Sequence, residues 1–333
     1  MGVLNVLGIE SSCDDTAIAV VQDGRHLVSQ AVASSAKIHA RYGGVVPEVA
    51  AREHTMAILP VLEETLERSR ISLSAIDAIA VTEGPGLLGA LLIGVTFAKA
   101  LGMGLGIPVV GVHHLEAHLY ANALIEPIAF PALGLLVSGG HTTIVLWQGH
   151  GRLDVLGETR DDAAGEAFDK GARALGLPYP GGPQIERLAR TARVEPRLRL
   201  PLANLGPESL DFSFSGLKTA TREMVVAYPD RPGDIAWALE DAVVRALVKT
   251  MTRALTRHPV HELYLAGGVS ANTALREQMS LLAARHAVRL HIPPVELCTD
   301  NAAMVAALGY YRLEAGHRMD MGASPRTNYP LGR

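Results

Sequence analysis

Two stretches of the chain begin in the same way, with an apolar strand, a short polar or glycine-rich tip and a second apolar strand. The first covers residues 6–21 and the second covers residues 133–147. Both patterns predict β-hairpins with polar tips. Each half then carries a strand, a glycine turn and a long helix, at 76–101 and at 262–284. This duplication predicts two related α/β domains that face each other across a cleft.

The length of 333 residues agrees with two domains, since domains of roughly 100 to 200 residues are common. We expect an N-terminal domain over 1–125 and a C-terminal domain over 126–301 with an insertion around 185–230; the segment 302–333 should pack back on the first domain. Residues 196–214 predict an irregular part of that insertion. Periodicity predicts helices over 47–69, 87–101, 113–124, 163–175, 235–257, 272–284 and 302–315.

Composition favours a globular cytoplasmic protein. Hydrophobic residues make up 48% of the chain and charged residues 19%. Cys13 and Cys298 share no motif, which suits a reducing compartment and predicts neither a disulfide framework nor a thiolate zinc site. The first residues lack the pattern of a secretory signal. Glycines, Lys99 and Pro108 interrupt the apolar run at 87–112, so this run predicts a buried helix and strand and no membrane span.

The net charge of -4 argues against a protein that binds nucleic acid by itself, because phosphate neutralisation needs a basic surface. One local exception is the segment from Arg187 to Arg199, which contains five arginines and a single acid, Glu195. This segment predicts either a solvated helix face or a local set of phosphate contacts.

Three glycine-rich tips favour a ligand that contains phosphate. They lie at 138–140, 180–183 and 267–272. Tips of this kind bring backbone N–H groups close to an anion, and a helix that begins there adds a favourable field. Glycine turns are common, so one tip alone would indicate little.

His114 and His118 are four residues apart in a predicted helix and therefore project from one face. The pair is either an ordinary helical pair or two ligands of one metal ion. Asp300, which precedes a predicted helix, is either an N-cap or a third ligand. A His/His/Asp set suits Fe(II), Zn or Mn. Glu116 follows His114 by two residues, not one as in zinc protease helices, so it turns away from this face.

The motifs of this sequence resemble those of one family over nearly the whole chain. It is the TsaD family, also called Gcp or OSGEP, of tRNA threonylcarbamoyltransferase subunits. The motifs that carry the resemblance are 8–16 (GIESSCDDT), 42–48 (YGGVVPE), 84–87 (GPGL), 113–118 (HHLEAH), 136–142 (LVSGGHT), 161–170 (DDAAGEAFDK), 179–183 (YPGGP), 211–218 (DFSFSGLK), 266–272 (AGGVSAN) and 298–301 (CTDN). Asp15 departs from bacterial members, which often carry Glu there.

The resemblance implies an actin-like ATPase fold with two RNase H-like domains. It also implies transfer of a threonylcarbamoyl group from threonylcarbamoyl-AMP to N6 of the adenosine 3′ of the anticodon, in tRNAs that read codons beginning with A, with release of AMP. The implied partners are tRNA, a TsaB-like paralogue of the same fold and a TsaE-like ATPase, without a membrane.

The resemblance also implies roles for residues. His114, His118 and Asp300 would bind one divalent metal, Fe(II) first and Zn second. Contacts with the substrate and with an ATP- or AMP-type nucleotide would come from Leu136, Val137, Ser138, Gly139, Gly140, Asp169, Gly182, Glu186 and Asn272.

The donor is an activated mixed anhydride, so positioning, charge stabilisation and one proton acceptor should suffice for the transfer. Asp14 at the first hairpin tip is our first candidate for the general base and Glu10 the second. Three rival hypotheses are a metalloprotease-like hydrolase, a small-molecule kinase or ATPase of the actin fold, and a scaffold paralogue without activity.

Overall fold

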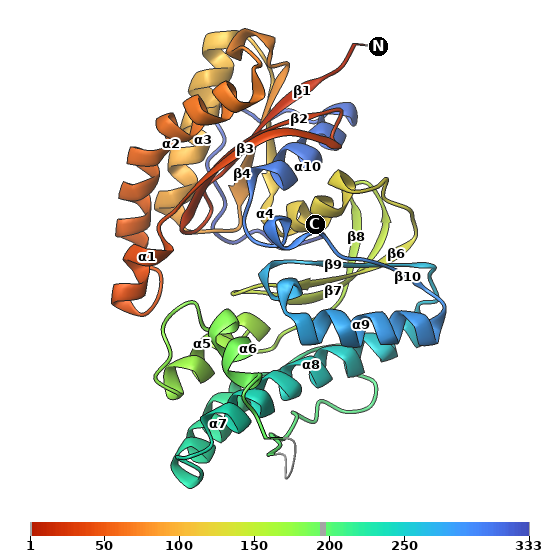
Figure 1. Ribbon diagram of the computed structural model, residues 1–333. Helices are drawn as coiled ribbons and strands as arrows, with labels where there is room; N and C mark the ends of the chain where they lie inside the picture. Colours follow the sequence, from red (N-terminus) through yellow and green to blue (C-terminus); the bar gives the residue numbers. More distant parts are fainter. Residues whose placement is uncertain (1, 194–197, 333) are drawn as a thin grey trace. The chain divides into compact units, whose positions relative to one another are not determined.

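The computed structural model describes residues 2–193 and 198–332 and divides the chain into two compact units (Figure 1). Unit 1 consists of Met1–Ile128 and Thr299–Arg333, and unit 2 consists of Ala129–Cys298. Each unit contains one five-stranded sheet with helices packed on it. The predicted α/β class is therefore confirmed.

The sheet of unit 1 has the strand order β3-β2-β1-β4-β5. Strands β1, β2 and β3 are antiparallel neighbours, whereas β4 and β5 run parallel to β1. The strands are β1 (Asn5–Glu10), β2 (Asp15–Gln22), β3 (His26–Ser34), β4 (Ala78–Gly84) and β5 (Val109–His113). The helices are α1 (Ala36–His39), α2 (Pro47–Ser69), α3 (Leu88–Leu105), α4 (His114–Tyr120) and α10 (Ala302–Glu314), with short 3-10 helices η1 (Ala40–Tyr42), η2 (Leu73–Ala75) and η3 (Ala121–Leu124).

Successive residues of β1 face opposite sides of the sheet of unit 1, and helices pack on both sides. Leu7 and Ile9 are fully buried in a cluster with side chains of α2 and α3. The residue between them, Gly8, faces the other way, and a Cβ there would overlap the carbonyl oxygen of Ala302 at the start of α10. The absence of a side chain at Gly8 thus lets α10 lie directly on β1, which brings the start of α10 to the polar end of the sheet.

The sheet of unit 2 repeats the same topology, with the order β10-β9-β6-β7-β8. Strands β6, β7 and β8 are antiparallel neighbours, and β9 and β10 run parallel to β6. The strands are β6 (Ala132–Val137), β7 (Thr142–Gly149), β8 (Arg152–Glu158), β9 (Glu262–Ala266) and β10 (Arg289–His291). The helices are α5 (Ala164–Ala174), α6 (Gly181–Ala189), α7 (Ser215–Ala227), α8 (Pro232–Arg257) and α9 (Thr273–His286), with 3-10 helices η4 (Gly268–Ala271) and η5 (Val295–Leu297).

The core of unit 2 joins its sheet to three helices. Leu133 and Leu135 of β6 pack in one cluster with Phe168 of α5, Leu239 of α8 and Leu275 of α9. Within the described part of the predicted insertion, α6 and α7 are helical and residues 198–214 contain neither helix nor strand. Residues 194–197 of the predicted irregular segment and of the arginine-rich segment lie outside the described residues.

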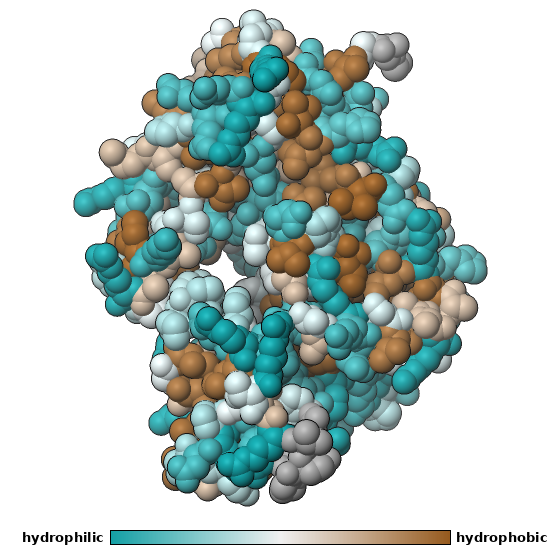
Figure 2. All heavy atoms as spheres, viewed as in Figure 1, coloured by the Kyte–Doolittle hydropathy of each residue, from teal (hydrophilic) through white to brown (hydrophobic). Residues whose placement is uncertain are grey.

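One helix of unit 1, α3, is long and apolar enough to cross a membrane by length and composition alone, with a mean hydropathy of 1.8. It packs on α2 and on β4, as a helix of a globular unit does. Even so, only 33% of this helix is buried. On the face drawn in Figure 2, apolar residues form small separate groups among polar ones.

Candidate functional site

The helix that carries the two histidines, α4, begins directly after β5. His113 is its N-cap, and the Nδ1 atom of His113 accepts the backbone N–H groups of Leu115 at 3.1 Å and Glu116 at 3.4 Å. These bonds satisfy two of the donors that a helix leaves free at its first turn. His113 therefore fixes the direction in which α4 leaves the sheet. The helix predicted over 113–124 ends at Tyr120, and the tighter 3-10 helix η3 follows.

The structure brings His114, His118 and Asp300 together within unit 1. The Nε2 atoms of His114 and His118 lie 3.6 Å and 3.2 Å from the same Oδ1 atom of Asp300. One ligand atom from each residue lies within 4.8 Å of the others. The N-cap of α10 is Asn301, whose side chain accepts the N–H of Met304 at 2.9 Å, so the alternative role of Asp300 as the cap is wrong.

These residues fit a divalent metal. The His118 ring is almost fully buried, and neither of its nitrogens has a hydrogen-bond partner among the described residues, although Nε2 lies 3.2 Å from Asp300. A buried polar group without a partner costs free energy, and an ion bound between the three side chains would remove that cost for Nε2. Two imidazoles and one carboxylate form a borderline donor set that leaves coordination positions open.

Glu10, at the end of β1, holds the other side of the His114 ring. The Nδ1 atom of His114 lies 3.0 Å from Glu10 Oε2, which also accepts the hydroxyl of Thr82 at 2.7 Å. Burial by itself raises the pKa of Glu10, but the charge and hydrogen bond of His114 outweigh it, and the pKa is lowered. Burial by itself lowers the pKa of His114, yet the attraction of Glu10 and Asp300 raises it to about 9.

The tip of the first hairpin lies next to this cluster and carries Asp14. Burial raises the pKa of Asp14, and repulsion from Asp300 raises it further. The neighbouring Asp15 has a pKa raised by burial to about 6. Burial also raises the pKa of the Cys13 thiol, which makes Cys13 a poor nucleophile. The side chain of His54 in α2 contacts this tip, since its Nε2 atom lies 3.1 Å from the carbonyl oxygen of Cys13.

In unit 2, the second hairpin tip lies against the start of α5. Leu136 and Val137 are buried in β6, so they can offer a ligand only their backbone. Ser138, Gly139 and Gly140 follow at the more exposed tip. The N–H of Gly165 in α5 donates to the carbonyl oxygen of Ser138 at 3.1 Å.

The remaining predicted ligand contacts form a second group in unit 2, around the first turns of α6 and α9. Asp169 Oδ1 accepts the N–H of Gly181 at 2.7 Å, next to Gly182, and burial raises the pKa of Asp169. Glu186 of α6 accepts the hydroxyl of Thr273 at 2.6 Å.

Asn272 is the N-cap of α9, and its side chain accepts the N–H of Leu275 at 2.9 Å. The side-chain amide of Asn272 donates to Glu240 Oε1 at 2.7 Å. Glu240 is 7% exposed in the middle of α8, and burial raises its pKa. This buried carboxyl therefore fixes the orientation of the Asn272 amide.

Comparisons with known proteins agree with these motifs. The family described as "TsaD: tRNA N6-adenosine threonylcarbamoyltransferase" matches residues 26–307. A Bacillus cereus protein named tRNA N6-adenosine threonylcarbamoyltransferase is 51% identical over 328 residues, which cover 96% of this chain and 95% of the relative. A protein of that name from Symbiobacterium thermophilum is 51% identical over 339 residues, covering 98% and 97%. The chain belongs to the TsaD family.

Solved structures place this TsaD-family chain in the actin-like fold. The HypF structure from T. kodakarensis gives a TM-score of 0.61 at 15% identity and covers 93% of this chain and 48% of HypF. Component A of the (R)-2-hydroxyglutaryl-CoA dehydratase from Acidaminococcus fermentans gives 0.55 at 13% identity, covering 93% and 99%. At such identities the likeness concerns the fold alone, and it confirms the predicted fold class.

Sequence reasoning missed the residues that orient the predicted site residues through hydrogen bonds. Ser12 and Thr82 bind Glu10, and Glu240 binds Asn272. A glutamate between the apolar neighbours of α8 was the only available signal for Glu240. Glu116 is 8% exposed and belongs to none of the described metal-ligand groups, and burial raises its pKa.

The described arginines of the segment from Arg187 to Arg199 are exposed. Arg190 pairs with Glu186 at 3.0 Å, and Arg193 reaches Asp234 at 3.8 Å, so neither is entirely without a counter-charge. Arg197 lies outside the described residues.

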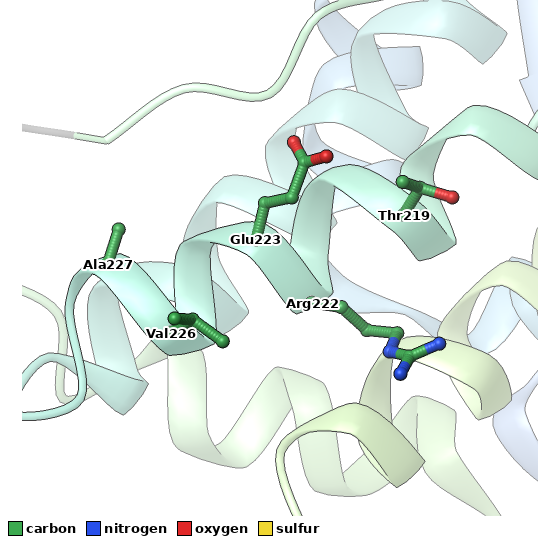
Figure 3. A pocket seen from close by; sticks show the side chains of 5 residues that line it. All are labelled: Thr219, Arg222, Glu223, Val226 and Ala227. Atoms are coloured by element: carbon green, nitrogen blue, oxygen red, sulfur yellow. The ribbon is translucent and has the colours of Figure 1, made fainter.

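A surface hollow of about 470 Å³ runs along α7 and is lined by Thr219, Arg222, Glu223, Val226 and Ala227 (Figure 3). Arg222 and Glu223 point to opposite sides of the helix in this view. The hollow is lined by none of the residues that the family resemblance assigns to the substrate.

Proposed function

We propose that this chain is a tRNA N6-adenosine threonylcarbamoyltransferase, which transfers the threonylcarbamoyl group of threonylcarbamoyl-AMP to N6 of the adenosine 3′ of the anticodon, in tRNAs that read codons beginning with A. The observation that carries the proposal is 51% identity along nearly the full length of relatives with that name. The cluster of His114, His118 and Asp300 supports it, because a cation held there would stabilise the negative charge of the phosphate and carboxylate of the donor.

His114, His118 and Asp300 would hold one divalent ion, with Fe(II) as the first choice and Zn as the second. Such an ion would supply Lewis-acid stabilisation and orientation of donor oxygens. Glu10 supports this role, because its bond to His114 Nδ1 leaves Nε2 as the only ring nitrogen that can face Asp300. The contacts of Glu10 assign it to positioning, so we place the general base at Asp14.

In the transfer, the adenine N6 forms a bond to the carbamoyl carbon, and the bond from that carbon to the phosphate oxygen breaks. AMP leaves with the bonding electrons, and Asp14 takes the surplus proton from N6. A raised pKa suits this task, since a general base works best when its pKa approaches the working pH.

The residues of unit 2 would bind the nucleotide part of the donor. Ser138 donates its N–H to His141 within the turn at 2.8 Å, so the amides of Gly139 and Gly140 are the ones we assign to negative charge on the donor. Asp169, Gly182, Glu186 and Asn272, together with the backbone of Leu136 and Val137, would contact the nucleoside.

Reconstitution tests the proposal. The chain, its partners, synthetic threonylcarbamoyl-AMP and an unmodified tRNA that reads an A-starting codon should yield threonylcarbamoyl-adenosine in nucleoside analysis. A tRNA that reads other codons is the matched control and should stay unmodified. No product with fully metal-loaded protein would refute the proposed activity.

The base assignment has its own test. The Asp14→Asn protein should bind metal and donor normally and lose transfer by about 100-fold or more, since a positioned base typically contributes 10²–10⁴. Single-turnover transfer at the parent rate would remove Asp14 from the mechanism.

The partners would be tRNA, a TsaB-like paralogue and a TsaE-like ATPase, in the cytoplasm. Support for a protein partner comes from α2 and α3, which pack against each other. Met56 and Leu59 of α2 are 71% and 57% exposed, and Leu88 and Leu92 of α3 are 52% and 42% exposed. Exposed large apolar side chains on two helices that pack together are consistent with a protein interface. We assign this apolar α2/α3 face to the TsaB-like paralogue.

No observation favours the rival functions. The buried Glu116 cannot act on water at the metal cluster as a protease base would. A kinase would phosphorylate a small molecule with Mg, and an inactive scaffold would gain nothing from two buried histidines that converge on a carboxylate.

A further inference from the structure

The last part of the chain, residues 317–332, lies on unit 1 as an extended segment that we call the C-terminal strap. Backbone and side-chain groups anchor it at four places. Met319 N–H donates to Val109 O at 2.7 Å, Lys99 Nζ donates to the carbonyl oxygens of Met321 (2.9 Å) and Ala323, Arg326 N–H donates to Glu83 O at 2.7 Å, and His113 Nε2 donates to Tyr329 O at 2.8 Å.

The strap crosses the ends of β4 and β5 in direct contact with the backbone. A Cβ at Gly84 would overlap the carbonyl oxygen of Arg326, so only glycine permits this approach. The Arg326 guanidinium lies 4.6 Å from the centre of the Tyr329 ring, and that ring lies 4.6 Å from the His113 ring. The Tyr329 ring of the strap thus lies between the Arg326 guanidinium and a buried histidine, which is 3% exposed.

His113 connects the strap to the helix that carries the metal-ligand candidates. Its Nδ1 atom accepts from the first turn of α4, so the ring hydrogen must lie on Nε2, where it is donated to Tyr329 O. The ring is thereby held at both nitrogens. The next residue is His114, and His118 follows one turn later on the same helix.

We propose that His113 is a positioning residue, through which the docked C-terminal strap fixes α4 and raises the affinity of His114, His118 and Asp300 for a divalent cation. The inference rests on the proposed metal site. It assigns a function to a histidine and to a chain end that the transfer reaction does not use directly.

Two variants separate the strap from the helix cap. His113→Asn keeps a side-chain oxygen for the N-cap position, where Asn is strongly preferred, but is too short to reach Tyr329. A chain that ends at Asn328 removes Tyr329 and keeps His113. Each should bind zinc about tenfold more weakly than the parent in competition with a chromophoric chelator. Losses of this size are typical when a residue that orients a metal ligand is replaced. Combined, they should lose little more than either alone, because both break the same link.

Arg326→Ala is the matched control. It removes the guanidinium contact with the Tyr329 ring and keeps the backbone bond to Glu83, so zinc affinity should stay near that of the parent. Parent-like affinity in both His113→Asn and the shortened chain would overturn the inference, with the proposed metal site intact. A parent protein that binds neither zinc nor iron would refute the metal site and the inference together.

Hydrogen exchange on the unaltered protein tests the coupling between the strap and the metal site even if the variants fail to fold. Coupling between two sites is reciprocal, so zinc binding must stabilise the docked strap as much as the strap stabilises zinc binding. The amides of Met319 and Arg326 should therefore exchange about tenfold more slowly with zinc than without it. Equal rates in a protein that demonstrably binds zinc would show that the strap and the site are independent.

Discussion

The two ring nitrogens of His114 have different tasks. Nδ1 lies 3.0 Å from the Glu10 carboxylate and 3.2 Å from the Ser12 hydroxyl, while Nε2 faces Asp300. Glu10 is fully buried, and Ser12 N–H and the Thr82 hydroxyl hold its two oxygens at 2.6 Å and 2.7 Å. A charge held this firmly makes the opposite nitrogen a better metal ligand and prevents the ring from turning.

Glu10→Gln preserves the size of the side chain and removes its charge. Without that charge the pKa of His114 should fall from about 9, and zinc should bind about 10- to 100-fold more weakly. Titration of the imidazole by NMR and a chelator competition measure the two effects. Thr82→Ser keeps the hydroxyl bond to Glu10 and should behave like the parent. Undiminished zinc affinity in Glu10→Gln would leave Glu10 without a positioning role.

Asp15 gives a pH dependence of stability. Burial raises its pKa from 3.8 to about 6, and one carboxylate oxygen has no hydrogen-bond partner among the described residues. The folded protein therefore binds this proton more tightly than the unfolded chain, so the contribution of Asp15 to stability falls as pH rises from about 4 through about 6.

Asp15→Asn should accordingly raise the free energy of unfolding at pH 7.5 by about 1–3 kcal/mol, a bound set by the size of the pKa shift. The gain should disappear below about pH 4. Urea denaturation across this range measures it, and Asp230→Asn, at an exposed position, is the control with no expected change. If the difference in the free energy of unfolding between Asp15→Asn and the parent did not vary with pH, the effect would come from packing and not from the charge of Asp15.

At the scale of elements, periodicity predicted helices well where turn chemistry marks their ends. The predicted helix 47–69 coincides with α2, which begins at Pro47, and both hairpins lie where strand and tip patterns placed them. The predicted helix 113–124 was too long at both ends: His113 belongs to β5 and caps α4, and the chain after Tyr120 tightens into the 3-10 helix η3.

Contacts between distant elements could not be predicted in the same way. Glu10 meets Thr82 across 72 residues, and Glu240 meets Asn272 across 32. Such pairs depend on strand order and helix packing, which local periodicity does not encode. The convergence of His114, His118 and Asp300 was expected only through the family resemblance, since the spacing alone left an N-cap role for Asp300 open.

Helix α6 and the described residues after it carry four exposed arginines, at positions 187, 190, 193 and 199. If this segment contacts tRNA, Arg187→Glu should weaken tRNA binding several-fold and reduce the slope of log affinity against log salt by about one unit or more. Arg285→Glu makes the same charge change at an exposed position of α9 and should have a smaller effect. Filter binding at several salt concentrations gives both quantities. Equal slopes in the two variants would make the arginines an ordinary solvated face.

At the scale of the whole molecule, an acidic chain that acts on tRNA needs help with binding. The net charge is -4, so the overall charge of the chain repels the phosphates of RNA. The apolar helix α3, of which 33% is buried, belongs to the face that we propose for the partner. Catalysis by the complex should thus depend on a surface that contains no catalytic residue.

Leu92→Asp tests the apolar α2/α3 face. Leu92 is already 42% exposed, so the variant should fold and bind zinc normally, yet its dissociation constant for the TsaB-like paralogue should rise tenfold or more, since a charge in an apolar interface is unpaired. Calorimetry or size-exclusion chromatography measures binding. Val226→Asp, 83% exposed on α7, is the control. Unaltered association of Leu92→Asp would place the partner elsewhere.

Unit 1 is assembled from both ends of the chain, with unit 2 between them. During synthesis on the ribosome, His114 and His118 emerge long before Asp300, and Tyr329 emerges later still. Unit 2 has a continuous sequence and can fold while translation proceeds. A nascent polypeptide that has not yet reached Asp300 therefore lacks the carboxylate of the proposed ion site, so the full set of three ligands exists only after unit 2 has been synthesised.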